Sequence, residues 1–284
     1  MRKKYLVLVL TITCISAAAQ SDVAPSPKKK RQPPTYTERL RISAGLFAAV
    51  NNTIVKVDGA NGQVGTTINF QKDLGFTQST ATFLGDIGWR ASRRSSFSLN
   101  FFHINRTSTH ILQKDINFGD STYFTNSRVQ GFFNTDIYQL SYGYSVLLRP
   151  RYEAGFAIGI HVVGAKSGLA LATTRGELSR EQNFGFTGLL PDLNVWGSYG
   201  IAKNWVINGS FGYLALGIDS TWGRILTFNT VVTYHFANRF SASVGYTGLN
   251  FKIEATRRIG KGDLEWGYNG PALTLNYSFG NKNW

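Results

Sequence analysis

The sequence predicts an all-β protein, an antiparallel up-and-down transmembrane β-barrel of ten strands, with eight or twelve strands as the alternative counts. Ten segments alternate apolar residues with other residues, which is the pattern of a strand with two different faces. Tight turns and longer connections also alternate along the chain, as they do in membrane barrels. After residue 19, no stretch approaches 18 consecutive apolar residues, which excludes a transmembrane helix there.

The ten alternating segments follow one another from Leu40 almost to the C-terminus. They cover residues 40–50, 82–90, 97–101, 138–148, 152–162, 193–201, 205–213, 226–236, 240–253 and 272–279. Within two of them the apolar residues change parity, between Phe101 and Phe102 and between Thr247 and Gly248. Each change predicts a β-bulge, because one extra residue reverses the facing of a strand. The first bulge would also keep His103 out of lipid.

The connections predict which end of the barrel carries the termini. Four are tight, namely 92–94, 149–151, 202–204 and 237–239. The longer ones are expected at 58–79, 105–130, 164–185, 217–223 and 254–265. Both termini then lie on the short-turn side, which is the periplasmic side of a membrane barrel. Strands longer than the roughly 9–11 residues needed for crossing are expected to continue as hairpins above the outer surface.

The first and last strands are expected to pair. An open strand edge cannot persist in hydrocarbon, because its backbone groups would have no partners. The segment 40–50 is therefore predicted to be the antiparallel neighbour of 272–279, and residues 280–284 form a short periplasmic tail.

The N-terminal residues 1–19 have the features of a secretory signal peptide. Arg2, Lys3 and Lys4 precede an apolar core, and alanines supply a cleavage site. Residues 20–38 are predicted to be a disordered, basic, Pro-rich periplasmic linker, and 39–284 the transmembrane β-barrel domain. The only cysteine, Cys14, lies in the signal peptide, so no disulfide is expected in the mature chain.

The formal net charge of +14 needs an anionic partner that an exported protein can reach. Export argues against nucleic acid. The expected partners are outer-membrane lipids and lipopolysaccharide, with cell-wall polymer as a partner for the basic tail.

Aromatic side chains near the short turns predict a girdle at the inner membrane–water interface. These residues are Trp89, Tyr144, Tyr152, Trp205, Phe236, Phe240 and Phe279. The polar faces of the strands are expected to line the lumen. The charged residues and histidines placed there are Arg41, Asp86, Arg90, Glu153, His161, Asp192 and His235.

The interior is expected to be narrow. A ten-stranded barrel is only slightly wider than an eight-stranded one, whose side chains fill it. Arg41, Arg90 and Glu153 fall near one end, where an ion-pair cluster that plugs the barrel is favoured over a conduction pathway. The alternation cannot tell inside from outside, so a soluble β-sandwich or lipocalin-like barrel remains the alternative fold.

No strong catalytic, cofactor or metal motif is present, so no cofactor and no metal site are expected. Non-enzymatic function is favoured over enzymatic function. The alternative is a hydrolase at the outer leaflet, with a site in the loops built on His110, Asp120 and Ser121, since a His with an acid and a Ser can support acyl hydrolysis.

The C-terminal strand resembles a known signal. The pattern of Tyr268, Gly270, Leu273 and Leu275 is similar to the C-terminal assembly signal of bacterial outer-membrane barrels. This resemblance implies that the strand engages the barrel assembly machinery. Residues 65–76, GTTINFQKDLGF, and 115–120, DINFGD, resemble stretches of poorly characterised members of this class. The chain therefore resembles small Gram-negative outer-membrane β-barrel proteins of the OmpA/OmpW-like type.

That resemblance implies a location and a range of functions. The location is the bacterial outer membrane, with both termini in the periplasm. The functions are a narrow, porin-like or plugged channel, or a structural or surface-binding protein. Lipid A deacylases and omptin-like proteases of the same architecture are the basis of the enzymatic alternative.

Overall fold

The computed structural model describes residues 38–59, 62–172, 178–218, 221–255 and 262–280. The predicted signal peptide, the predicted linker apart from Glu38, and the tail 281–284 lie outside these ranges. Within them, no helix has the length and apolar character that membrane crossing requires.

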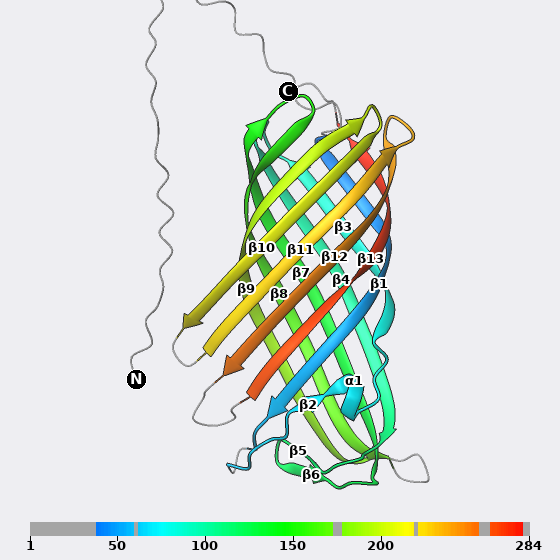
Figure 1. Ribbon diagram of the computed structural model, residues 1–284, viewed down its shortest axis with the longest axis vertical. Coiled ribbons are helices and arrows are strands. Elements are labelled where there is room, and N and C mark those ends of the chain that lie inside the picture. Colours follow the sequence, from blue (N-terminus) through cyan, green and yellow to red (C-terminus); the bar gives the residue numbers. More distant parts are fainter. Residues whose placement is uncertain (1–37, 60–61, 173–177, 219–220, 256–261, 281–284) are drawn as a thin grey trace, which may run out of the picture. The chain divides into compact units, whose positions relative to one another are not determined.

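Ten antiparallel strands form a closed ring (Figure 1). They are β1 (Leu40–Val57), β3 (Ser79–Arg90), β4 (Ser95–Ile111), β7 (Arg128–Leu148), β8 (Tyr152–Ala172), β9 (Leu178–Ala202), β10 (Trp205–Ile218), β11 (Thr221–His235), β12 (Phe240–Ala255) and β13 (Gly262–Phe279). The ring closes where β1 pairs with β13, from Leu40 opposite Phe279 to Val57 opposite Gly262. The ten-stranded fold and the pairing of the first and last strands are as predicted.

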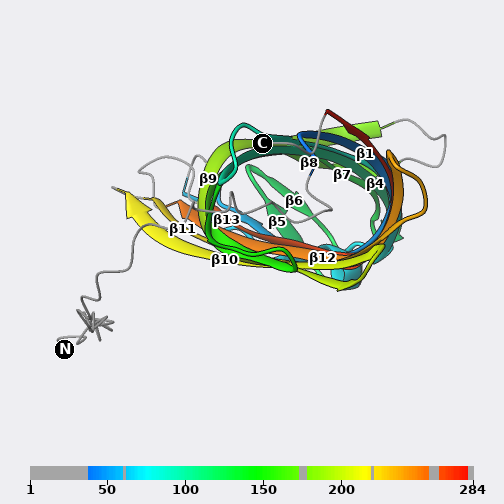
Figure 2. The ribbon, with the colours of Figure 1, turned by 90° about the horizontal axis from the view of Figure 1, so that it is seen from above.

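Four short elements gather at one end of the barrel. They are β2 (Ile68–Asn69), α1 (Phe70–Asp73), β5 (Ile116–Phe118) and β6 (Ser121–Tyr123). Figure 1 shows them at the end opposite the tight turns, and Figure 2 shows β5 and β6 within the outline of the ring. We call these two ends the long-loop end and the short-turn end.

Along the part of each strand outside the long-loop end, the apolar side chains point outward. On β13, Leu275 is 65% exposed, whereas its neighbour Asn276 is 4% exposed. Every strand of the ring exposes a large apolar side chain in this way. Examples from β1 to β13 are Leu46, Phe83, Phe101, Leu140, Ile158, Leu193, Phe211, Phe228, Val244 and Leu275. A soluble sandwich would hide these residues, so the structure decides the question that the alternation left open.

The strands extend further than their sequence pattern indicated. β7 begins at Arg128 and β8 ends at Ala172, so much of the expected loops 105–130 and 164–185 is strand. Likewise, only residues 219–220 separate β10 from β11, where a loop of 217–223 was expected. The long loop boundaries were therefore wrong, whereas the expected continuation of the strands into hairpins is confirmed.

Both predicted β-bulges are wrong. Pairing continues without a shift through Phe101 and Phe102 on β4, and through Thr247 and Gly248 on β12. Register irregularities occur elsewhere, between Ser145 and Leu147, Leu169 and Leu171, and Trp205 and Val206.

The parity of the apolar residues changes because the inward-facing side chains change from polar to apolar along the barrel. Towards the long-loop end, the inward residues are apolar: Ile104 is fully buried on β4, and so is Phe251 on β12. Many of the outward residues there are polar, although Ile111 and Leu216 are exposed. His103 therefore stays on the outer face with its side chain 53% exposed, and its Nδ1 lies 2.7 Å from Oδ1 of Asp136. The apolar residues change sides while the strand continues its regular pleat.

Candidate functional site

The interior near the short-turn end holds a bidentate ion pair. Arg90 on β3 donates from Nη1 and Nη2 to the two carboxylate oxygens of Glu153 on β8, at 2.9 and 2.8 Å. The hydroxyl of Ser145 also hydrogen-bonds to this carboxylate. β3 and β8 are not neighbours in the ring, so the pair crosses the interior. The Glu153 side chain is 1% exposed, which makes this a desolvated contact.

The other sequence-predicted lumen residues lie in separate contacts. Arg41 pairs with Asp86 on the adjacent strand at 2.9 Å, with 47% of the Arg41 side chain exposed. His235 lies 3.8 Å from Glu38. Thus Arg41 does not join Arg90 and Glu153 in one cluster, because register places it opposite Gly88 and its guanidinium pairs with Asp86.

His161 and Asp192 form a buried pair deeper in the barrel. Both residues are at most 2% exposed, and Nδ1 of His161 lies 3.8 Å from Oδ1 of Asp192, too far for a hydrogen bond. The other carboxylate oxygen accepts a hydrogen bond from Asn194 at 2.5 Å. Gly159 makes room for this carboxylate, since a Cβ there would come within 2.0 Å of Asp192 Oδ1.

A layer of aromatic rings closes the interior further towards the long-loop end. Phe133 on β7 contacts Trp266 on β13 with ring centroids 5.9 Å apart. Phe102 on β4 contacts Tyr268 on β13 at 5.0 Å. In each pair the two strands are separated in the ring by at least two others, so the contacts cross the interior of the barrel. We call Phe102, Phe133, Trp266 and Tyr268 the aromatic layer.

The segment between β1 and β3 covers this layer. We call residues 62–78 the plug segment. Its helix α1 begins after Asn69, whose side chain accepts from the backbone N–H groups of Gln71 and Lys72, and Asp73 accepts from the Asn69 N–H in return. Gly75 follows the helix at φ 66°, a conformation that favours glycine.

The plug segment is held by its apolar side chains. Phe70, Leu74 and Phe76 are each at most 3% exposed, and the Phe70 ring lies 5.7 Å from that of Phe133. A four-residue helix could not persist without such packing, because short helices are unstable by themselves. The plug segment is therefore part of the core rather than a free loop.

The β5–β6 hairpin completes the cover. Ile116, Phe118 and Tyr123 are at most 1% exposed, and the Tyr123 hydroxyl donates to the carbonyl of Leu169 on β8 at 2.8 Å. The hairpin also joins the preceding loop, since the Asn117 N–H donates to the Thr66 hydroxyl. The two loop regions thus form one structured cap.

Arg106 lies under the plug segment and was missed by the sequence analysis, which placed it in a loop. The residue is 3% exposed, and its Cζ lies 5.5 Å from the ring of Phe76 and 5.1 Å from that of Phe133. Its Nη2 donates to the Thr53 hydroxyl at 2.5 Å. Continued alternation after Phe102 was the signal that could have placed Arg106 on the inner face.

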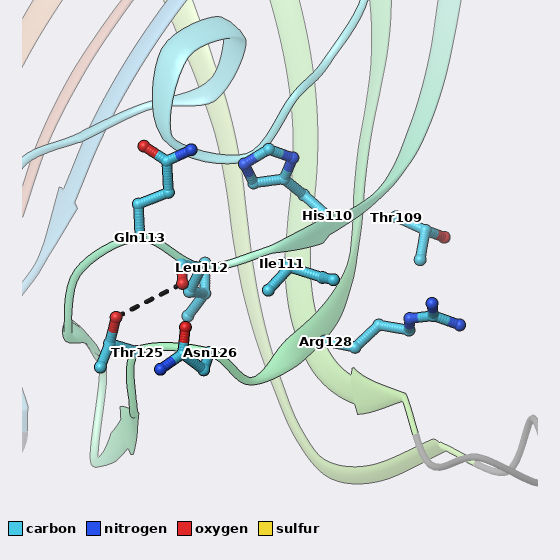
Figure 3. Close-up of a pocket in the computed structure, with 8 residues that line it drawn as sticks. All are labelled: Thr109, His110, Ile111, Leu112, Gln113, Thr125, Asn126 and Arg128. Carbon is cyan, nitrogen blue, oxygen red and sulfur yellow. Dashed lines mark hydrogen bonds between the residues drawn. The ribbon is translucent and has the colours of Figure 1, made fainter.

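The residues of the enzymatic alternative do not share the pocket that contains the histidine. An open pocket at the end of β4 and β7 is lined by His110, Gln113, Asn126 and Arg128 among others, but not by Asp120 or Ser121 (Figure 3). The His110 ring lies close to Gly75 of the plug segment, where an added Cβ would meet its Nδ1 at 2.8 Å. This imidazole therefore packs against the plug segment.

The aromatic residues expected in the girdle are all exposed. The least exposed of the seven, Phe279, has an exposed fraction of 39%. Several contact a neighbouring ring, for example Trp205 with Tyr234 at 4.6 Å. Among the described residues, no three His, Cys, Asp or Glu side chains come close enough to hold a metal ion.

Comparison with known proteins places the chain by its fold. No protein-family model matches the sequence, and no curated protein matches it either. The outer membrane protease OmpT from Escherichia coli is similar in structure, with 13% identity, coverage of 84% of this chain and 96% of that chain, and a TM-score of 0.51. The fold is that of a Gram-negative outer-membrane β-barrel. The resemblance found in the sequence is thereby confirmed.

Two further solved structures are more distant. The toluene transporter TodX of Pseudomonas putida is 8% identical, with coverage of 87% and 92% of the two chains and a TM-score of 0.33. Ail of Yersinia pestis is 10% identical, with coverage of 83% and 97% and a TM-score of 0.35. The similarity to OmpT, at 13% identity, shows the fold alone, so an activity has to be argued from the interior and the cap.

Proposed function

We propose that this chain is an integral protein of the bacterial outer membrane whose barrel is closed to diffusion and whose cap serves a structural or surface-binding role. The observation that carries the proposal is the single cluster of buried side chains across the interior. All ten strands of the ring contribute to it or pack against it, together with the plug segment and the β5–β6 hairpin.

The outer face supports insertion in a membrane. On β7, the outward apolar residues run from Tyr138 to Val146, and on β8 from Tyr152 to Val162. These lengths match the roughly 9–11 residues of a tilted strand that crosses a bilayer. Above them the outward positions become polar, as Asn134 and Lys166 illustrate. The proposed orientation puts the short turns and both termini in the periplasm and the cap outside.

The interior supports closure rather than conduction. The Arg90–Glu153 pair obstructs the lumen near the short-turn end, and the aromatic layer obstructs it nearer the long-loop end. The plug segment adds a third obstruction. A conducting barrel of this size would need a continuous polar path past the aromatic layer, whose rings contact each other across the interior. Removal of the plug segment alone would leave the aromatic layer in place.

The test is electrical recording with a folding control. Protein that shows heat-modifiable migration on gels is incorporated into planar bilayers, beside a barrel of known conductance. We expect no discrete conductance steps from this chain. Reproducible steps that disappear after heat denaturation would overturn the closed barrel, and recovery of the protein in the soluble fraction of cells would overturn membrane insertion.

A further inference from the structure

Arg106 is a buried cation without a counter-ion. Its Nε and Nη1 are buried and have no hydrogen-bond partner, although a guanidinium offers five N–H donors. Among the described residues, no carboxylate lies within ion-pairing distance of it. The two aromatic rings and the Thr53 hydroxyl satisfy only part of its charge. Buried charges in proteins are normally paired with an opposite charge.

Three other unpartnered donors belong to residues beside Phe133 or Thr53, the two residues that Arg106 contacts. The indole N–H of Trp266 has no acceptor, and the Trp266 ring contacts Phe133. The Ser167 hydroxyl is also without a partner, and Ser167 is directly opposite Phe133 in the β7–β8 register. The amide nitrogen of Gln71 is a third, and its Oε1 accepts from the N–H of Thr53.

The missing partner is therefore an acceptor with negative charge. Two nitrogens of Arg106 lack an acceptor, and so do three neutral donors on residues beside Phe133 and Thr53. Arginine recognises the oxygens of carboxylates and phosphates through charge-assisted hydrogen bonds. A cationic or apolar ligand would leave all of these donors unsatisfied.

We propose that the plug segment closes over an oxyanion-binding site centred on Arg106, with Trp266, Ser167 and Gln71 as further donors. The ligand class is a carboxylate or phosphate group. It reaches the site from the long-loop end, because Phe76 covers the guanidinium there and belongs to the plug segment. This site goes beyond the closed barrel, which needs no ligand.

The experiment titrates the folded full chain in detergent with sodium phosphate and, separately, with sodium acetate. Ionic strength is kept constant with sodium chloride, and binding is measured by calorimetry and tryptophan fluorescence. We expect saturable binding of at least one oxyanion. Arg106→Met should weaken it at least tenfold, whereas Arg128→Met, which removes an exposed arginine of the same end, should leave it unchanged.

The outcomes separate the ligand classes and the alternatives. Saturation by phosphate alone assigns a phosphate ligand, and saturation by acetate alone assigns a carboxylate. Binding that survives in Arg106→Met, or no binding of either anion to the wild type, overturns the site and leaves Arg106 as a cation that only stacks on Phe76 and Phe133. If Arg106→Met fails to show heat-modifiable migration, Trp266→Phe supplies the variant, since it keeps an aromatic ring and removes the N–H.

The outcome of the anion titration does not depend on whether the barrel is closed. Conductance steps from the wild type would contradict the proposed function and would leave the anion titration unaffected. Conversely, a silent barrel that binds neither anion would contradict only the oxyanion site.

Discussion

Removal of Arg90 should destabilise the barrel strongly, because it would leave a carboxylate buried without a counter-ion. The Glu153 side chain is 1% exposed and accepts both of its short charged contacts from Arg90. Breaking a buried pair by removing one partner costs about 3–5 kcal/mol. Arg90→Met should therefore lower the folding equilibrium constant roughly a hundredfold to several thousandfold.

Two further variants show whether the unpaired charge is the cause. Arg90→Met combined with Glu153→Leu removes the charge altogether and should return stability to within about 1–2 kcal/mol of the wild type, with the lost Ser145 contact as the remainder. The matched control is Arg41→Met. That ion pair has an Arg41 side chain 47% exposed, so its loss should cost about 1 kcal/mol or less.

The assay is equilibrium urea unfolding of protein folded into lipid vesicles, followed by tryptophan fluorescence and by gel migration without boiling. Equal slopes of free energy against urea for all variants are required, since they indicate a common unfolded state. An Arg90→Met variant within about 1 kcal/mol of the wild type, or a double variant less stable than the single one, would refute the reasoning.

Four other variants test the remaining levels of the structure. Leu275→Lys on the outer band should cost about 2–4 kcal/mol in the same urea assay, because a charge would face lipid. Trp266→Ala in the aromatic layer should cost about 3–5 kcal/mol, measured likewise. His103→Ala should change stability by about 1 kcal/mol or less, since its pair with Asp136 is exposed. His110→Ala should leave the mass spectrum of lipid A unchanged on expression, and an altered spectrum would revive the enzymatic alternative.

The strands, their two faces and their neighbours could be predicted from the sequence because these features depend on local pattern. A period of two assigns each strand two faces, and tight turns assign neighbours. Closure was expected because an open strand edge has no backbone partners in hydrocarbon, so residues 40–50 were predicted to pair with 272–279. The observed pairing includes these residues and continues to Val57 and Gly262.

The interior could be predicted only in part, because its contacts depend on which strands face each other. Arg90 and Glu153 are 63 residues apart in the sequence, and the prediction that they share an ion-pair cluster rested on their common position near the short turns rather than on a local pattern. The sequence proposed a cluster that included Arg41, and the register assigns Arg41 to Asp86 instead. The helix α1 has four residues, too few for any periodic signal, and its order derives from Phe70 packing on Phe133.

The two incorrect bulges identify the physical feature that organises the whole chain. A strand that continues past the membrane passes from lipid into water on its outer face, so its apolar residues are stabilised only if they move to the inner face. On β12 this takes the apolar positions from Val244 outside to Phe251 inside without any break in pairing.

The inversion of faces explains why the barrel has a core at its long-loop end. Inward apolar residues from all ten strands would face an empty lumen unless something filled it, and the aromatic layer and the plug segment do so. The same filling buries Arg106, the one cation in this part of the described interior that lacks a carboxylate partner. The proposed closure of the barrel and the unpaired donors beneath the plug segment thus have a common origin in strands that extend beyond the outward apolar band.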